Sequence, residues 1–369
     1  MVSGFRFKSY CCILMVLVSA ILFSGQLLAQ EQKDTLTLEE AIKLSLEQGS
    51  ASRLALFELQ EAEVSYKQSM ADLILRPSVT TELSVKAAWV TAQRDYEIAR
   101  ADIATQVEQA YYDVLKAERG LVLARENLTQ AEDQLKVAES KFKLGMVAQI
   151  DVITADAEFA SAEAEMSRAE SNLALNRMRL NRLIGIALDS TRKLTSQFKY
   201  APISFNCEKA IQYALSNRPE IKRAEDTVAL KKKEVEVYTN DFTPPLVLEK
   251  AKAGLSYAEA GLEDVKTGIA LEVRQNLESF EDAKRQVPLQ EKSLLRAKES
   301  LRIAKARYEA GVITAIELRD AQRAVYQAET AYLQAMFDYN VALTKFYKSL
   351  GISLERRAQA FEQLVQKGH

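Results

Sequence analysis

The sequence predicts a mainly α-helical protein made of two long coiled-coil helical hairpins, with little β structure. Three observations carry this prediction. Strong helix formers such as Ala, Glu, Leu and Lys are abundant, while 12 glycines and 6 prolines punctuate the 369 residues. Two segments of the chain match each other at a fixed offset. Each of them contains a heptad pattern sustained over about 40 residues.

The first 29 residues predict a secretory signal peptide. Arg6 and Lys8 form a short basic region, residues 11–23 are apolar, and residues 27–29 fit a cleavage site. The apolar run is too short and too close to the N-terminus for a membrane-spanning helix. The cleavage site has no lipid-anchor motif. We therefore expect residues 1–29 to direct export, with an uncleaved segment as the alternative.

The exported chain is expected to be mildly acidic. Loss of the signal peptide removes Arg6 and Lys8 and leaves 47 basic against 51 acidic residues, a net charge near −4. This balance argues against a nucleic acid partner, because phosphate binding requires clustered Lys and Arg. One cysteine, Cys207, remains, so no internal disulfide is expected. No later stretch is long and apolar enough for a transmembrane helix.

One structural unit occurs twice in the chain. A segment around Gly145 corresponds to one around Gly311 at an offset of 166 residues, and the same offset pairs Asp151 with Glu317. Near the starts of the two units the offset is 169. Two copies of such a large unit indicate a duplicated domain rather than a short solenoid repeat. We expect a first hairpin repeat at 30–186, a linker at 187–203, a second hairpin repeat at 204–352 and a C-terminal tail at 353–369.

Each repeat is expected to contain one very long helix. Its apolar residues alternate at spacings of four and three, which is typical of a coiled-coil helix. Alanines alternate with larger residues and let a partner helix approach closely. The first register runs through Ile103, Val107, Ala110, Val114, Ala117, Leu121, Ala124, Leu128, Ala131, Leu135, Ala138 and Phe142. The second runs through Ile269, Val273, Asn276, Phe280, Ala283, Val287, Gln290, Leu294, Ala297, Leu301, Ala304 and Tyr308.

A return helix with its own apolar seam is expected after each long helix. Gly145 and Gly311 are predicted to form the turns at the hairpin tips, because glycine readily takes the left-handed conformation that ends a helix. Asp151 and Glu317 are predicted to begin the return helices, where the helix dipole stabilises a carboxylate.

Shorter helical regions are expected before the long helices. They cover residues 36–75, with a break at 48–50, and residues 206–238, with a break at 217–219. A strand is predicted at 77–86, because β-branched and apolar residues alternate there with polar ones. The corresponding residues 242–247 contain two prolines, which argue against a paired strand.

These residues resemble the TolC-type outer-membrane efflux proteins. The opening segment 36–46 (LTLEEAIKLSL) is echoed by residues 208–221. The hairpin tips match as well, especially residues 307–318 (RYEAGVITAIEL), and so do residues 104–112 (ATQVEQAYY) with their partner 270–277 (ALEVRQNL). The resemblance covers nearly the whole exported chain.

The resemblance implies that the chain is the protomer of an α-barrel. Members of the family form homotrimers in which twelve long helices build a periplasmic tunnel. The hairpin tips meet a periplasmic adaptor protein and an inner-membrane pump. Four strands per subunit contribute to a barrel in the outer membrane. A transmembrane strand needs about 9–11 residues. This sequence offers at most one strand in the first repeat and none in the second, so contact with outer-membrane lipid stays open.

The resemblance also implies candidate site residues at the tips. Asp151, Glu317 and Asp320 match positions that line the narrow tunnel entrance, where three subunits would create a ring of negative charge that favours cations. Tyr308 and Asp151 match a pair that joins adjacent hairpins and holds the entrance shut. The alternatives are helix capping for the carboxylates and ordinary packing for Tyr308.

Other conspicuous residues have simpler interpretations. Pro288 lies inside the second long helix without a counterpart in the first and is predicted to kink it. Trp89 is interpreted as a core residue rather than an interfacial anchor. Packing is the favoured interpretation of the aromatic residues in the last helix, which are Tyr326, Tyr332, Phe337, Tyr339, Phe346 and Tyr347.

Catalysis finds no support in the sequence. The one histidine is His369, and no Cys/His cluster, phosphate-binding glycine loop or nucleophile elbow occurs. We therefore expect no enzyme activity, no cofactor and no metal site. The leading prediction is an outer-membrane efflux channel component of a tripartite pump or type I secretion system, acting as a passive trans-periplasmic duct. The alternative is a soluble periplasmic scaffold derived from such a duct. An adaptor protein would need a lipoyl-like β domain, which is not visible.

Overall fold

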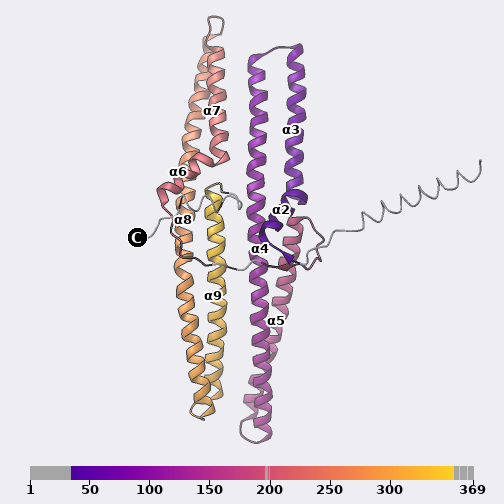
Figure 1. The fold of residues 1–369 in the computed structure, drawn as a ribbon, viewed down its shortest axis with the longest axis vertical. Coiled ribbons are helices and arrows are strands. Elements are labelled where there is room, and N and C mark those ends of the chain that lie inside the picture. Colours follow the sequence, from indigo (N-terminus) through magenta and orange to yellow (C-terminus); the bar gives the residue numbers. More distant parts are fainter. Residues whose placement is uncertain (1–34, 196–197, 199, 353–356, 358–363, 365–369) are drawn as a thin grey trace, which may run out of the picture.

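The computed structural model describes residues 35–195, 198, 200–352, 357 and 364 (Figure 1). The predicted signal peptide, residues 1–29, lies outside these residues, and so does most of the predicted tail. The elements in chain order are β1 (Thr35–Leu36), α2 (Leu38–Gln48), α3 (Ser50–Leu75), α4 (Val79–Lys143), α5 (Gln149–Ile184), β2 (Lys193–Leu194), α6 (Cys207–Asn217), α7 (Pro219–Tyr238), α8 (Pro245–Glu309) and α9 (Ala315–Ser349).

Each repeat is a long rod that carries a hairpin connection at either end (Figure 1). In the first repeat, α3 packs beside the N-terminal half of α4 and α5 packs beside its C-terminal half. In the second repeat, α7 and α9 flank α8 in the same way. Helix α4 also contacts α7 and α9, so it joins the repeats. We name the connections 144–148 and 310–314 the lower tips, and the connections 76–78 and 239–244 the upper turns.

The structure confirms that one unit occurs twice. Helices α4 and α8 both contain 65 residues, about 100 Å at 1.5 Å per residue, and match end to end at the offset of 166. Helices α2 and α6 both contain 11 residues and match at the offset of 169. The two offsets differ because α3 has 26 residues and α7 has 20, while the second upper turn is longer.

The two predicted breaks in the shorter helical regions are confirmed. Gly49 separates α2 from α3, and Arg218 separates α6 from α7. Helix α2 begins at a capping box in which Thr37 Oγ1 accepts from the Glu40 N–H at 3.1 Å and the Thr37 N–H donates to Glu40 at 3.0 Å. A Cβ atom at Gly49 would lie 2.7 Å from the carbonyl oxygen of Leu183. The corner between α2 and α3 therefore sits directly on the end of α5.

The strand predicted at 77–86 is wrong, because α4 begins at Val79 and continues through the whole segment. Ser78 has an extended conformation and its hydroxyl accepts from the Thr81 N–H at 3.3 Å, which is a helix N-cap. Glu82 and Lys86 then form an ion pair one helical turn apart. The cap and the packing of α3 against α4 outweigh the β propensity of Val79, Thr80, Thr81 and Val85.

The first hydrophobic core lies where α2, α4 and α5 meet. Val107 and Val114 of the heptad register pack there against Leu180 and Ile184 of α5, together with Tyr111, which follows the register position Ala110. The Tyr111 hydroxyl donates to the carbonyl oxygen of Leu36 at 2.8 Å, so this buried phenol is satisfied by the segment before α2. The heptad prediction for α4 is confirmed from Ile103 to Ala131. The remaining side chains of the register, from Leu135 to Phe142, are more exposed toward the lower tip.

The second core is rich in aromatic residues. Phe205, Phe280 and Phe346 form a cluster with ring centroids 4.8–6.2 Å apart, and Tyr339 lies 5.4 Å from Phe280. The Tyr339 hydroxyl donates to the carbonyl oxygen of Ala201 at 2.6 Å, and burial raises the pKa of Tyr339 to about 12. The packing interpretation is confirmed for Tyr339 and Phe346. Trp89 stacks on Tyr66 of α3 at 6.0 Å but is only partly buried and lies outside both hydrophobic cores, so the predicted core position is not confirmed.

The segment between the repeats contacts both of them. Strand β2 pairs in parallel with β1, with Lys193 beside Thr35. Pro288 lies inside α8, which continues to Glu309 without interruption. Proline lacks the N–H that would bond to the carbonyl of Lys284, and that oxygen instead accepts from the Tyr200 hydroxyl at 3.4 Å. The linker thus satisfies a backbone group that the proline leaves free.

The repeats are joined near mid-height by a buried polar cluster, which we name the waist cluster (Glu108, Tyr112, Thr344 and Arg357). The Glu108 side chain is 2% exposed and accepts two hydrogen bonds from the Arg357 guanidinium, at 2.7 and 2.6 Å. It also accepts from the Thr344 hydroxyl at 2.7 Å. Burial and the charge of Glu108 raise the pKa of Tyr112. The cluster links α4, α9 and the C-terminal segment.

Candidate functional site at the lower tips

The two lower tips have the same turn. Gly145 has a φ of +72°, and the Met146 N–H donates to the carbonyl oxygen of Lys141 at 2.8 Å. Gly311 has a φ of +71°, and the next residue makes the equivalent bond at 2.9 Å. A Cβ atom at either glycine would meet open space, so the left-handed backbone alone favours glycine. The predicted tip turns are confirmed.

Asp151 and Glu317 occupy the third position of their return helices. Glu317 forms a full capping box, since it accepts from the Thr314 N–H at 2.8 Å and its own N–H donates to the Thr314 hydroxyl at 3.3 Å. Asp151 accepts from the Ala148 N–H at 3.1 Å, which is half of such a box because alanine offers no side-chain acceptor. The backbone and then the hydroxyl of Thr314 lower the pKa of Glu317. Both carboxylates therefore have a capping role.

The other two predicted site residues point to different partners. Asp320 is exposed and lies 4.0 Å from the Arg323 guanidinium on the same helix. The Tyr308 hydroxyl accepts from the Lys141 ammonium, whose nitrogen is also 4.6 Å from the centre of the Tyr308 ring. Lys141 belongs to the first hairpin and Tyr308 to the second. Tyr308 thus joins the two hairpins of one chain, and its predicted pairing with Asp151 stays a prediction.

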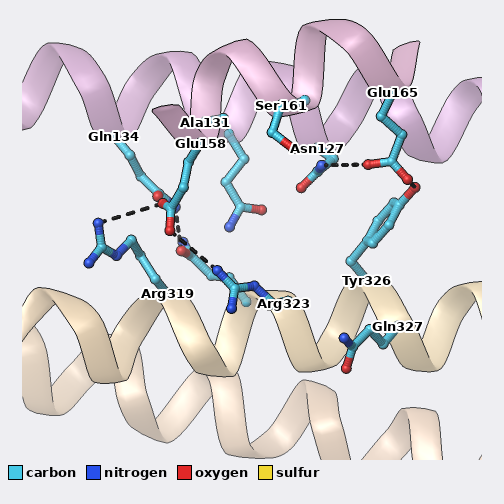
Figure 2. Close-up of a pocket in the computed structure, with 13 residues that line it drawn as sticks. Asn127, Ala131, Gln134, Glu158, Ser161, Glu165, Arg319, Arg323, Tyr326 and Gln327 are labelled. Carbon is cyan, nitrogen blue, oxygen red and sulfur yellow. Dashed lines mark hydrogen bonds and ion pairs between the residues drawn. The ribbon is translucent and has the colours of Figure 1, made fainter. Parts of the chain in front are cut away.

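Above the tips, polar residues from α4 and α5 face polar residues of α9 (Figure 2). Glu158 of α5 lies 3.6 Å from Arg319 and 3.3 Å from Arg323. Glu165 accepts from the Tyr326 hydroxyl at 2.7 Å. We name this set the polar seam; it comprises Asn127, Gln134, Glu158, Glu165, Arg319, Gln322, Arg323 and Tyr326.

The polar seam lines an open cleft of about 290 Å³ between the hairpins (Figure 2). Glu165 and Tyr326 also border a hollow of about 640 Å³ that reaches Lys116 and Asp113. Burial raises the pKa of Asp113, and burial followed by the hydrogen bond to Glu165 raises the pKa of Tyr326 to about 12. The hairpins therefore meet through a few polar contacts around open space rather than through a packed core.

Sequence reasoning missed most of the polar seam. No sequence motif singles out Glu158, Glu165, Arg319 or Arg323, and packing is the interpretation that the sequence favours for Tyr326. A partial signal exists, because Arg319 and Arg323 are four residues apart on α9 and so share a face. Their common partner lies more than 150 residues away in the sequence, and no local spacing reveals such a pair.

In the part of the chain that the structure describes, no cluster of His, Cys, Asp or Glu side chains is suited to hold a metal ion. Among the same residues, none of the helices has the length and apolar character needed to cross a bilayer.

Comparison with known proteins identifies similar sequences and folds. The sequence profile described as "Outer membrane efflux protein" matches residues 84–186 and 247–352. The chain is 21% identical to outer membrane protein TolC of Vibrio cholerae over 332 residues, which cover 74% of this chain and 76% of that protein. It is 22% identical to nodulation protein T of Rhizobium leguminosarum bv. trifolii over 324 residues, covering 73% and 67%.

The fold is also similar to that of solved structures. The crystal structure of the CmeC outer membrane channel of Campylobacter jejuni superimposes with a TM-score of 0.72 at 15% sequence identity. The superposition covers 88% of this chain and 89% of that one. At this identity the likeness is one of fold. The regions that match the sequence profile, residues 84–186 and 247–352, contain both lower tips and most of both long helices.

Proposed function

Because the chain belongs to the outer membrane efflux protein family, we propose that it is exported and acts as a passive duct across the periplasm. In this proposal three copies assemble side by side into a tunnel, and no step is enzymatic. An inner-membrane pump hands solutes to the duct through a periplasmic adaptor protein, either in a tripartite pump or in a type I secretion system.

One observation carries the proposal most directly, namely the matched pair of lower tips. Both end a 65-residue helix at a left-handed glycine, and both start the return helix with a carboxylate at the third position. Both also expose apolar side chains, among them Met146, Ile150, Val312 and Ile316. Apolar tips at the end of stiff rods suit contact with the adaptor, which we propose as the partner at this end.

The polar contacts between the hairpins suit an entrance that opens and closes. Lys141 and Tyr308 join the hairpins close to the tips, and Glu158 joins them to Arg319 and Arg323 higher up. Partly exposed ion pairs contribute little stability, typically about 0.2–1 kcal/mol each, so they separate without unfolding the rods. The ring of negative charge that Asp151, Glu317 and Asp320 of three copies would form belongs to this proposal, and so does the Tyr308–Asp151 pair across adjacent hairpins.

A deletion strain tests the proposal. We expect cells that lack the protein, with its partner pump present, to accumulate more of at least one dye or antibiotic than cells that contain it. Export should return on expression of the wild-type chain. Unchanged uptake of every compound across a broad panel would contradict the duct.

A crosslink tests the entrance. Gln134 and Gln322 touch across the polar seam. In a Cys207→Ser background, Gln134→Cys and Gln322→Cys joined by a short bis-maleimide should hold the hairpins together and lower export. The two single variants, treated in the same way, are the matched controls. Full export with the crosslink in place would show that the hairpins need not separate.

The alternative, a periplasmic scaffold derived from such a duct, draws on the helical conformation of residues 79–86, where a strand was expected. Cell fractionation distinguishes the two proposals. Recovery with the outer membrane supports the duct, whereas recovery in the soluble periplasm alone supports the scaffold.

A further inference from the structure

The duplication gives the molecule two free flanks that match the interface between its own repeats. Inside the chain, α4 and α5 of the first repeat meet α7 and α9 of the second. The counterparts of these helices are α8 and α9 on one side and α3 and α5 on the other. In Figure 1, α8 lies along one outer edge of the molecule, and α3 and α5 lie along the opposite edge. One chain therefore carries both halves of a second interface, which another copy can complete.

At the lower end, each residue of the polar seam has a smaller counterpart on these flanks. The offset of 166 residues places Ala324 at the position of Glu158 and Ile153 at that of Arg319. Ile153 is 54% exposed in the single chain. Two serines and Asp156 take the positions of the three amide side chains. We name the apolar counterparts the apolar seam; it comprises Ile153, Ala157, Ala160, Ala324 and Ala331.

Higher up, the repeats are joined by charged residues of α4 and α7. Asp95 of α4 lies 2.8 Å from the Arg223 guanidinium of α7. Arg94, the preceding residue of α4, lies 3.5 Å from Asp226 of α7. The two helices therefore exchange one acid and one base in each direction.

The flanks carry apolar residues at the positions that match this charged contact. On α3 the counterparts of Arg223 and Asp226 are Leu54 and Phe57, which are 63% and 55% exposed. On α8 the counterparts of Arg94 and Asp95 are an alanine, at 260, and Gly261. A Cβ atom at Gly261 would meet open space. Large apolar side chains on one flank thus correspond to very small residues on the other, and the two shapes fit together.

At the tips, one contact keeps its chemistry on the flanks. Inside the chain the Lys141 ammonium nitrogen lies 4.6 Å from the centre of the Tyr308 ring. The counterparts of these residues are Arg307 and Phe142, and Phe142 is 44% exposed. A guanidinium over an aromatic face is also a favourable cation–π contact. The flanks therefore match each other in chemistry as well as in position, which favours a second copy over an unrelated partner.

We propose that neighbouring copies dock through the apolar seam, and that the entrance opens at the polar seam inside each chain. In the contact between copies, the α3 face of one copy packs on the small residues of α8 in the next, and Arg307 lies over the ring of Phe142. That copies lie side by side rests on the proposed function. The chemistry of their contact and the place of opening go beyond it.

The two seams separate at different cost. The polar seam borders an open cleft, and its ion pairs exchange their partners for water when they part. The apolar seam excludes water once a neighbour covers it, so its separation exposes apolar surface. The waist cluster has no counterpart between copies, since Arg274 and Met178 replace Glu108 and Thr344. The repeats of one chain are thus fixed to each other at mid-height, and neighbouring copies are fixed to each other nearer the lower tips.

A cross-link between copies tests the contact in the purified exported protein. In a Cys207→Ser background, Phe142→Cys with Arg307→Cys and a short bis-maleimide should join two and three chains on a denaturing gel. Lys141→Cys with Tyr308→Cys is the matched control, because these residues touch inside one chain. The control should react within the chain and keep the mass of one chain.

Sedimentation of the protein without the cross-linker separates the possible outcomes. A trimer in which the first double variant stays unlinked would overturn the apolar seam and leave the trimeric duct in place. A protein that sediments as a single chain would contradict both, and would leave the flanks to a different partner.

A charge exchange at the α3–α8 contact supplies a second test. Phe57→Asp places a carboxylate against the apolar face of the next copy and should weaken assembly at least ~tenfold. Adding Ala260→Arg recreates between copies the pair that Arg94 and Asp226 form inside the chain, and should restore most of the loss. Circular dichroism verifies that the helices are intact. Unchanged assembly of the single variant, or no recovery in the double variant, would contradict the contact.

Export from the complemented deletion strain locates the opening. The cross-link between Gln134→Cys and Gln322→Cys holds the polar seam and should lower export. The cross-link between Phe142→Cys and Arg307→Cys holds neighbouring copies together and should leave export unchanged. An equal loss of export in both variants would overturn the assignment of opening to the polar seam. Wild-type export in the same strain reports on the duct itself, so its failure is separate from a failure of this inference.

Discussion

Two of the carboxylate–arginine contacts that join the repeats differ strongly in burial. At the waist cluster the side chain of Glu108 is 2% exposed and meets Arg357 through two parallel hydrogen bonds. At the polar seam the side chain of Glu158 is 29% exposed and lies between Arg319 and Arg323 at longer distances. Removing one partner of a buried ion pair lowers the stability of the folded protein far more than removing one partner of an exposed pair. The repeats are therefore fixed at mid-height and only loosely held near the lower tips.

This difference suits a molecule whose lower end moves while its middle does not. The waist cluster lies among packed aromatic residues, with Phe198 between Tyr112 and Phe337. The polar seam borders an open cleft instead. Separation of the hairpins at the seam exposes groups that water already reaches, so its free-energy cost is small.

The largest effect is expected at the waist cluster. Glu108→Ala leaves the Arg357 guanidinium without its carboxylate in a largely buried place, and should lower the free energy of unfolding by about 3–5 kcal/mol. Urea unfolding followed by circular dichroism measures this. Glu108→Met combined with Arg357→Met is the control, because it replaces both charges by apolar groups and should recover most of the loss. A change below 1 kcal/mol in the single variant would remove the distinction between waist and seam.

A smaller effect is expected for Tyr326→Phe at the polar seam. It removes the hydroxyl that donates to Glu165 at 2.7 Å while keeping the ring. The expected loss is about 1 kcal/mol, the usual net contribution of one hydrogen bond. Tyr332→Phe is a matched control on the same helix. Thermal unfolding of both variants gives the comparison, and a loss as large as that of Glu108→Ala would show that the seam is also a fixed contact.

Glu158→Gln should change stability still less. Each of its ion pairs contributes about 0.2–1 kcal/mol, and salt screens them. The difference between wild type and variant should therefore shrink when the salt concentration rises from 0.05 to 1 M. Glu163→Gln, also on α5, serves as the control. An effect that is large and independent of salt would indicate that Glu158 is more deeply desolvated than its exposure suggests.

The smallest effect concerns the lower tip and depends on pH. Because Thr314 lowers the pKa of Glu317, the cap stabilises the fold above the ordinary pKa of glutamate and loses this contribution as the pH falls through the lowered pKa. The thermal midpoint of wild type should thus exceed that of Glu317→Gln at pH 7 by a small margin that disappears once the pH falls below the lowered pKa of Glu317. A margin that stays constant through an acid titration of both proteins would contradict the capping role.

Much of the architecture could be predicted from the sequence, because it depends on local signals. Glycine at 49, 145 and 311, together with the heptad register, predicted the breaks, tips and long helices. The strand at 77–86 was wrong, because the alternation of Val79, Thr81 and Leu83 says nothing about the neighbouring helix α3 that packs there. The sequence also predicted helix capping by Asp151 and Glu317, as the alternative to a charged ring at the entrance.

The contacts between the repeats were not visible in the sequence. Glu108 lies within residues 104–112, which resemble the family, yet nothing near it in the sequence indicates that Arg357, 249 positions away, will contact it. The same holds for Lys141 with Tyr308. Such pairs depend on how two rods are placed side by side, and that placement is set by packing rather than by any local pattern.

The equal length of α4 and α8 limits how this chain can change in evolution. Each residue inserted in one of these helices would turn everything below it by about 100° and move it by 1.5 Å, so its heptad face would leave the partner helix. Changes of length are then tolerated in steps of seven and in both helices together. The upper turns are freer, since α3 and α7 already differ by six residues. Inherited insertions should therefore accumulate at the upper turns and be rare in the rods.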